Sequence, residues 1–297
     1  MTAEMTDMPK FGSTPRELLA DVLQKLKTES EAANERVSEH AGSFKRRRLV
    51  EFVFLICEEL KLEPFIKFQT IEIFERYMIK HVETLFYNAS ANDAPGTQKD
   101  IQEFLGQKLF EEINLLLFSC IQITSKLSLR CNFDKTDTAL TVLRSLGFSY
   151  KKETILESEL RILKTLNFSL NVQNPLMYIE TLLEVWGYND SAVPIIDVHK
   201  TCLAVLQFVY LQRNPIYQKL LVTAVGNSNP TEVQRIKFLS VKEDCMLLAV
   251  SVISVSAFIV NFTSWTQILE ELSSITGITA DNISDISCFI LKHILEN

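Results

Sequence analysis

Glycine and proline are both scarce in this 297-residue sequence, with eight of each. Average usage of the two types together is about 12% of residues. The glycines are also scattered, and the closest two, Gly96 and Gly106, are ten residues apart. A phosphate-binding loop needs several glycines close together, so P-loop, dinucleotide-binding and kinase-type glycine loops are excluded. Asn-Gly and Asp-Gly hairpin turns are missing as well, which favours helices over a meandering β chain.

The sequence also lacks the residue groupings of a metal site or a catalytic centre. Its six cysteines include no Cys-x-x-Cys pair, and its four histidines are far apart, so we expect reduced thiols, no metal and no cofactor. No nucleophile and base are grouped along the chain, which predicts that the protein is not an enzyme. The start of the chain lacks the apolar core of a secretory signal. The most apolar stretch, residues 245–260, is shorter than the about 20 residues of a membrane span and predicts a buried helix.

The charge balance limits the partners that the chain can bind. The net charge is −7, which argues against a nucleic-acid-binding domain and makes direct nucleic-acid binding unexpected. The exception is the basic run Lys45, Arg46, Arg47 and Arg48. Four cations at the start of a helix oppose the helix dipole. Three interpretations remain open for this run: a solvated face, a nuclear-import signal, or a contact with an acidic partner or a phosphate.

Apolar spacing predicts an all-α protein made of two tandem helical bundles of about five helices each, with an additional N-terminal helix. We expect a disordered start plus N-terminal helix over 1–43, a first bundle over 44–168 and a second over 174–297. Two expected helices, about 100–128 and 240–261, are apolar nearly all round, which is typical of a helix surrounded by others. The other expected helices are about 44–61, 64–86, 136–146, 150–166, 175–187, 194–212, 215–225, 265–275 and 280–295.

The N-terminal helix has a clear predicted start. Thr14 and Glu17 have the spacing of a capping box, and Pro15 suits the first helical position. The leucines that follow at helical spacing form one apolar stripe: Leu18, Leu19, Leu23 and Leu26. This stripe indicates packing on the second half of the chain, with the binding of a partner helix as the alternative.

Three segments carry a resemblance to a known family. They are RLVEFVFLICEELKLEPFIKFQTIEIFERYM from Arg48, the ITSKL end of the helix at about 100–128, and YKKETILESELRILKTLNFSL from Tyr150. In this order they resemble the cyclin box. The C-terminal segments YIETLLEVWGYN, FLSVKEDCMLLAVSVISVSAFI and SITGI resemble a divergent cyclin-like family linked to the maturation of meiotic crossovers. The resemblance implies a nuclear regulatory protein on meiotic chromosomes, with some cytoplasmic protein, that acts with recombination proteins and a cyclin-dependent kinase.

The resemblance also assigns roles to individual residues. Lys126 and Glu159 match the lysine and glutamate that face the kinase in cyclins, and Leu127 and Leu129 flank them. Arg46 and Glu75 match an arginine and an acidic residue that form a structural ion pair between the first two box helices. For Arg46, membership of the solvated basic run is the alternative interpretation.

The sequence departs from the cyclin pattern at three places. Leu127, Ser128 and Leu129 stand where cyclins have an aromatic residue and acidic residues, which weakens the expectation of kinase binding. Lys45 and Arg48 occupy two positions of the apolar substrate-docking patch, and residues 88–99 form a longer predicted loop than in cyclins. The alternative functions are therefore a kinase-independent scaffold for recombination or replication factors and a cyclin fold that binds nucleic acid, as in general transcription factors.

Overall fold

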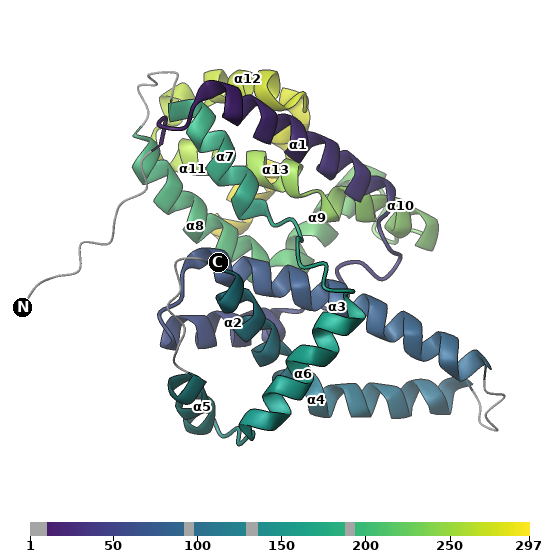
Figure 1. The fold of residues 1–297 in the computed structure, drawn as a ribbon. Coiled ribbons are helices and arrows are strands. Elements are labelled where there is room, and N and C mark those ends of the chain that lie inside the picture. Colours follow the sequence, from purple (N-terminus) through teal and green to yellow (C-terminus); the bar gives the residue numbers. More distant parts are fainter. Residues whose placement is uncertain (1–10, 92–97, 129–135, 188–193) are drawn as a thin grey trace, which may run out of the picture. The chain divides into compact units, whose positions relative to one another are not determined.

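The computed structural model describes residues 11–91, 98–128, 136–187 and 194–297, and these form thirteen α-helices and one short 3-10 helix without a strand (Figure 1). The prediction of an all-α fold is confirmed for these residues. The chain divides into two compact units. One unit is His40–Gln173, and the other combines Met1–Glu39 with Asn174–Asn297. Each unit is described separately below.

The His40–Gln173 unit contains five described helices arranged around one of them. They are α2 (Arg47–Glu59), α3 (Pro64–Ala91), α4 (Gln98–Leu127), α5 (Thr136–Ser145) and α6 (Lys152–Thr165). Helix α4 packs against α2, α3 and α6, and every residue from Leu115 to Ser125 is buried. Its buried hydroxyls donate back to carbonyls one turn earlier, as Ser119 does to Leu115 at 2.8 Å, so the helix can be buried on all sides. The predicted central helix of the first bundle is therefore present.

The start of the predicted loop 88–99 is helical, because α3 continues to Ala91 and α4 already begins at Gln98. Positions 92–97 lie outside the described residues. Alanine and serine in the segment from Asn88 to Ala91 allow the helix to continue, since none of these residues breaks it in the way that glycine or proline would. The polar composition of this segment therefore did not identify the backbone conformation of residues 88–91.

The second unit holds helix α1 (Arg16–Glu35) and the seven helices that follow residue 174. These seven are α7 (Pro175–Gly187), α8 (Ile195–Leu211), α9 (Arg213–Val225), α10 (Glu232–Glu243), α11 (Cys245–Val260), α12 (Trp265–Thr276) and α13 (Ala280–Glu296), and the 3-10 helix η1 (Phe262–Ser264) precedes α12. Helix α11 is the central helix and packs against α7, α8, α12 and α13. Its residues from Leu248 to Ala257 are all buried, so the most apolar stretch is the core of this unit.

The expected single helix over 240–261 is wrong, because the chain breaks at Asp244 between α10 and α11. Asp244 leaves the helical conformation, and its side chain accepts a hydrogen bond from the backbone N–H of Leu247 at 2.9 Å. Aspartate is a preferred N-cap residue, so Asp244 stabilises the start of a separate helix, α11, and the helix of α10 does not continue through it. A capping box is present at the start of α10, where Thr231 and Gln234 bond reciprocally.

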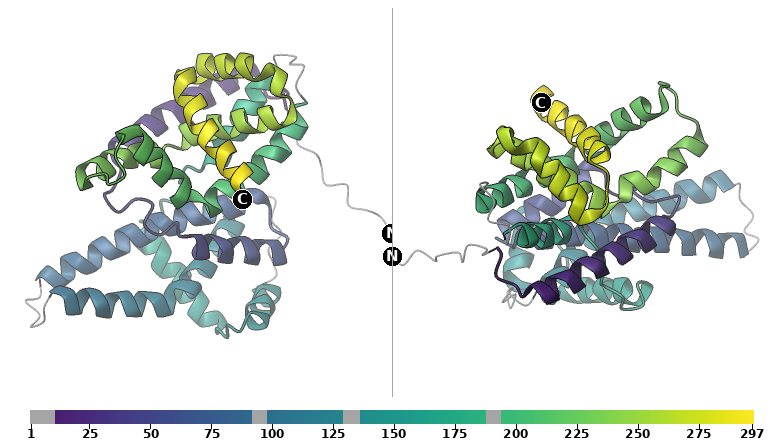
Figure 2. Two further views of the ribbon diagram at one scale, coloured as in Figure 1. Left: turned by 180° about the vertical axis from the view of Figure 1, so that it is seen from behind. Right: turned by 90° about the horizontal axis from the view of Figure 1, so that it is seen from above.

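Helix α1 packs on α7, α10 and α11, as its apolar stripe predicted (Figure 2). Leu19 and Leu26 are its buried leucines, whereas Leu18 of the predicted stripe is exposed, and the Tyr178 hydroxyl donates to the Leu26 carbonyl. The end of the helix is held by Asn34, which donates to Asp244 at 2.9 Å. The N-terminal helix therefore belongs to the same unit as the second half of the chain.

The segment before α1 is held by a single carboxylate. Glu184 of α7 accepts hydrogen bonds from three consecutive backbone N–H groups, those of Gly12 (2.9 Å), Ser13 (2.8 Å) and Thr14 (2.6 Å). The predicted capping box with Glu17 is not formed, since Pro15 is the N-cap residue and no side chain caps α1. We call residues 11–14 and Glu184 the N-terminal latch.

The latch gives the packing of α1 a pH dependence with a definite sign. Partial burial acts to raise the pKa of Glu184, but the hydrogen bonds from Thr14, Gly12 and Ser13 outweigh it, so that the pKa is lowered. A lowered folded-state pKa means that the stabilisation is present above the unfolded pKa of about 4.3 and is lost as the pH falls through the folded pKa. We expect hydrogen exchange of α1, corrected for intrinsic rates, to accelerate below about pH 4.3. In Glu184→Gln this acid-induced step should be absent; an identical step in that variant would contradict the assignment.

Candidate functional site

The structure brings Lys126 and Glu159 together on neighbouring helices of the His40–Gln173 unit. Lys126 lies in the last turn of α4, and its ammonium contacts both carboxylate oxygens of Glu159 on α6, at 2.8 Å and 2.6 Å. The two side chains differ in exposure: that of Lys126 is 49% exposed and that of Glu159 is 9% exposed. A buried carboxylate therefore fixes a cation that remains accessible from outside. Lysine near the end of α4 is also favoured by the negative end of the helix dipole.

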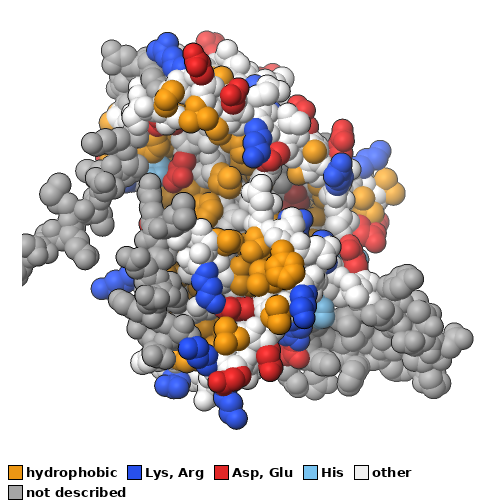
Figure 3. Space-filling view, viewed as in Figure 1, with side chains coloured by type: hydrophobic (Ala, Val, Ile, Leu, Met, Phe, Trp, Pro, Cys, Tyr) orange, Lys and Arg blue, Asp and Glu red, His pale blue; other side chains and the backbone are white. Residues whose placement is uncertain are grey.

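Exposed leucines surround this ion pair. Leu156 and Leu160 lie three residues before and one residue after Glu159 on α6, and Leu127 follows Lys126 on α4. All three are close to half exposed, and hydrophobic side chains gather over α6 on the face seen in Figure 3. Leu129, which the sequence placed in the same group, lies outside the described residues. The region formed by Lys126, Leu127, Leu156, Glu159 and Leu160 is called the α4–α6 face below.

A second ion pair fixes the two helices that carry this face. Arg161 of α6 contacts Glu112 of α4 at 2.9 Å. Together with the Lys126 pair it connects α6 to α4 at two points along the helices. The exposed leucines are therefore displayed on a fixed support, which lowers the entropy lost when a partner binds.

The chemistry available at the α4–α6 face is recognition by contact. The ammonium of Lys126 has three N–H donors, and its exposed side can donate to a carbonyl oxygen of a partner. The leucines offer apolar area around that donor. An oriented ammonium surrounded by apolar side chains suits the C-terminal end of a partner helix, where backbone carbonyls lack intrahelical hydrogen bonds.

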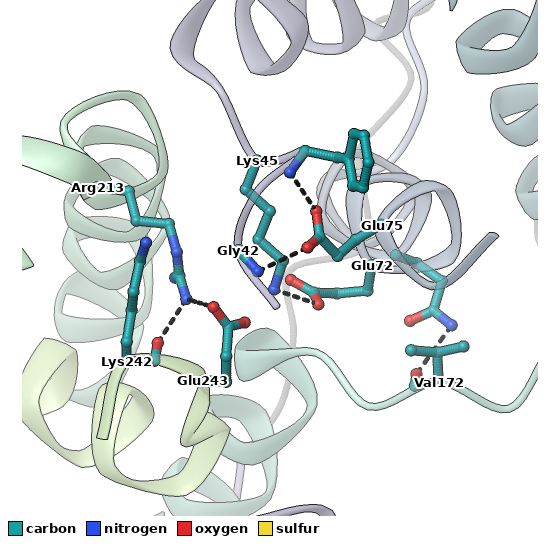
Figure 4. A network of polar contacts seen from close by, with 10 residues as sticks. Gly42, Lys45, Glu72, Glu75, Val172, Arg213, Lys242 and Glu243 are labelled. Carbon is teal, nitrogen blue, oxygen red and sulfur yellow. Dashed lines mark hydrogen bonds and ion pairs between the residues drawn. The ribbon is translucent and has the colours of Figure 1, made fainter. Parts of the chain in front are cut away.

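The predicted pair of Arg46 and Glu75 is not formed. Arg46 is exposed, and its Nε donates to the Ser43 carbonyl at 3.3 Å. Glu75 is buried on α3 and accepts from the backbone N–H groups of Gly42 (2.6 Å) and Phe44 (3.0 Å), as Figure 4 shows. Arg46 is the N-cap residue of α2, and its side chain bonds back to the preceding turn at Ser43 in place of Glu75.

Lys45 takes the structural role that the sequence assigned to its neighbour. Its side chain is 5% exposed, and the ammonium contacts Glu72 of α3 at 2.6 Å (Figure 4). Residue 45 therefore leaves the solvated basic run, which is reduced to three exposed arginines, Arg46, Arg47 and Arg48. Arg47 pairs with Glu51 one turn along α2 at 2.7 Å. The burial of Lys45 also explains how a lysine can stand at a position that is apolar in cyclins.

A further buried ion pair in the other unit was not found from the sequence. Arg213 at the start of α9 is buried and contacts Glu243 at 2.9 Å, and it also donates to the Lys242 carbonyl. Its guanidinium lies over the ring of Tyr217, 5.1 Å from the ring centroid. These contacts tie α9 to the end of α10 at the break before Asp244. No local pattern links residues thirty positions apart, so only the structure could identify them.

Among the described residues, no group of three or more histidine, cysteine, aspartate or glutamate side chains is arranged to hold a metal ion. No single described helix has the length and hydropathy that a membrane crossing requires; α10 and α11 pass that test only jointly, with a bend of 63° between them. None of the described cysteines takes part in a disulfide, and burial raises the pKa of Cys202 to about 12.

The first bundle corresponds to a known family. Residues 19–171 match the family described as "Cyclin, N-terminal domain", and this match covers half of the chain. It includes all five helices of the His40–Gln173 unit and both sides of the Lys126–Glu159 pair. The chain belongs to the cyclin family, as the three segments from Arg48 to Leu170 indicated.

Two relatives extend the similarity into the C-terminal half. The chain is 43% identical over 286 residues to "Cyclin N-terminal domain-containing protein 1" of Mus musculus. The aligned residues cover 96% of this chain and 85% of the mouse protein. It is 42% identical over 294 residues to the human protein of the same name. These aligned residues cover 98% of this chain and 88% of the human protein. The similarity therefore spans both units and not the cyclin domain alone.

Proposed function

We propose that this chain is a non-enzymatic regulatory protein that uses its α4–α6 face to bind a cyclin-dependent kinase during the maturation of meiotic crossovers. The observation that supports this proposal is the pair of Lys126 and Glu159, in which a buried carboxylate holds an accessible ammonium. The lysine and glutamate match the positions that face the kinase in cyclins. The meiotic role rests on the resemblance of the C-terminal segments to a cyclin-like family linked to crossover maturation, and the two relatives are similar over both halves of the chain.

The proposed mechanism is a shift in the population of kinase conformations. Lys126 donates to carbonyls near the kinase's regulatory helix, and Leu156 and Leu160 pack against that helix. A ligand shifts a conformational equilibrium only by the difference between its affinities for the two states, so this face must prefer the active orientation of the helix. Catalysis then resides in the partner, whose phosphoryl-transfer groups are aligned by that helix.

A kinase-independent scaffold is the second candidate, and one observation favours it. Leu127 and Ser128 replace the aromatic and acidic residues that follow the lysine in cyclins, and Leu127 is half exposed. The loss of these acidic residues after the lysine gives up part of the electrostatic selection among partners. In this case the same leucines bind a recombination or replication factor.

Co-purification from meiotic tissue separates the two candidates. The full chain, carrying an affinity tag, is isolated from nuclei and from cytoplasm, and the bound proteins are quantified relative to the chain. A cyclin-dependent kinase at about one copy per chain in the nuclear fraction supports the proposal. Consistent absence of any kinase, with another recombination factor present in that ratio, would establish the scaffold instead.

A further inference from the structure

The N-terminal latch contains an acceptor for protein phosphorylation. Of the eight prolines in the sequence, only Pro15 follows a serine or threonine. Thr14-Pro15 is therefore the single dipeptide that a proline-directed protein kinase could use. Thr14 is partly buried between the exposed residues Ser13 and Pro15, and its side chain also hydrogen-bonds the Glu184 carboxylate.

The same threonine is part of the contact that holds the chain before α1. The Thr14 N–H makes the shortest of the three backbone hydrogen bonds to Glu184, at 2.6 Å. On the other side of the latch, Gly12 crosses the end of α7 so closely that a Cβ on Gly12 would lie 2.6 Å from the Gly187 carbonyl oxygen. Phe11 then contacts the ring of His199 on α8, with the ring centroids 5.2 Å apart. The latch is a specific, tight contact with one carboxylate at its centre.

We propose that Thr14 is a phosphorylation site for a proline-directed protein kinase and that phosphate at this position opens the latch and loosens α1. In the reaction, Thr14 Oγ1 forms a bond to the γ-phosphorus of ATP, and the bond from that phosphorus to the ADP oxygen breaks. ADP leaves, and the hydroxyl proton passes to the base of the kinase. The product carries a group of charge close to −2 next to a residue that binds the Glu184 carboxylate.

Two opposing effects decide the outcome, and their comparison favours opening. A phosphate near the start of α1 is favoured by the helix dipole. The Glu184 carboxylate, however, already occupies the N–H groups of Gly12, Ser13 and Thr14, so the phosphate gains no free donor from the latch and faces a like charge. The close approach of Gly12 and Gly187 leaves little room for the segment to shift and relieve this repulsion. Release of residues 11–14 separates the two anions and removes the first anchor of α1.

The test uses the full chain, ATP and a purified proline-directed kinase. Mass spectrometry locates the phosphate, and hydrogen exchange is measured for α1 before and after the reaction. We expect one phosphate at Thr14 in the wild type and none in Pro15→Ala. Amides of Arg16–Glu35 should then exchange about tenfold faster in the phosphorylated chain.

Glu184→Gln is the matched variant that removes the like charge and keeps the side-chain length. Its α1 amides should exchange faster than those of the wild type without any phosphate, and phosphorylation should accelerate them further by less than about twofold. Failure to phosphorylate Thr14 in the chain, under conditions that modify a peptide of residues 9–19, would overturn the proposed site. Unchanged or slower exchange of α1 after phosphorylation would overturn the opening. These results are independent of whether the α4–α6 face binds a kinase.

Discussion

Replacing Lys45 with methionine is expected to lower the free energy of unfolding of the His40–Gln173 unit by about 3 kcal/mol. The Lys45 side chain is 5% exposed, and the variant leaves the Glu72 carboxylate buried without the cation that contacts it at 2.6 Å. An uncompensated buried charge is among the few causes of such large effects. The slowest-exchanging amides of α3 and α4 report the free energy of this unit separately from the other.

Arg46→Ala is the matched control for Lys45→Met. Arg46 is exposed and donates only to the Ser43 carbonyl, so its removal should change the free energy of unfolding by less than about 0.5 kcal/mol. The double variant Lys45→Met/Glu72→Leu should recover most of the loss, because both members of this buried ion pair are then replaced by apolar side chains. A large effect of Arg46→Ala with a small effect of Lys45→Met would contradict this account and would support the ion pair of Arg46 and Glu75 that the cyclin pattern predicted.

Replacing Leu160 with glutamate is expected to weaken binding of a cyclin-dependent kinase by about 30-fold, which corresponds to about 2 kcal/mol. Leu160 is 46% exposed on the α4–α6 face, so the folded unit tolerates the change. In the complex the new carboxylate would be buried in an apolar contact next to Glu159. The dissociation constant of the purified chain and kinase, measured by calorimetry, gives this ratio.

Val233→Glu controls for the general effect of a new surface charge. Val233 is exposed on α10, which belongs to the other unit, and it is remote in sequence from the α4–α6 face. This variant should bind the kinase within about twofold of the wild type. Equal binding by Leu160→Glu and the wild type would place the kinase contact elsewhere on the chain.

Much of the fold could be predicted because it follows from local patterns. Two helices that are apolar on all sides, α4 and α11, could only be central, and the structure has them so. The break at Asp244 was missed because the apolar run on its C-terminal side continues the helical spacing of Phe238 and Leu239 across it. An aspartate inside such a run can either continue the helix or cap the start of a new one. The packing of the two segments decides between these conformations.

The candidate site could be predicted in part, and the limit is the direction of side chains. Lys126 and Glu159 could be paired because both match positions of the cyclin pattern, and because a lysine at the end of an apolar central helix needs an acidic partner or a route to water. Lys45 and Arg46 precede α2, where no helical phase decides which of two adjacent cations turns inward. Glu184 and Gly12 are 172 residues apart, and no local signal in either segment reports their contact.

Affinity for a cyclin-dependent kinase, compared between the wild type and Lys126→Glu, tests the central claim most directly. The substitution removes the exposed donor and sets two carboxylates side by side, so the dissociation constant should rise by about 100-fold or more. Lys164→Glu makes the same charge reversal at an exposed position in the last turn of α6 and should change it by less than about threefold. The same dissociation constant for both variants and the wild type would contradict the assignment of the α4–α6 face as a kinase-binding surface.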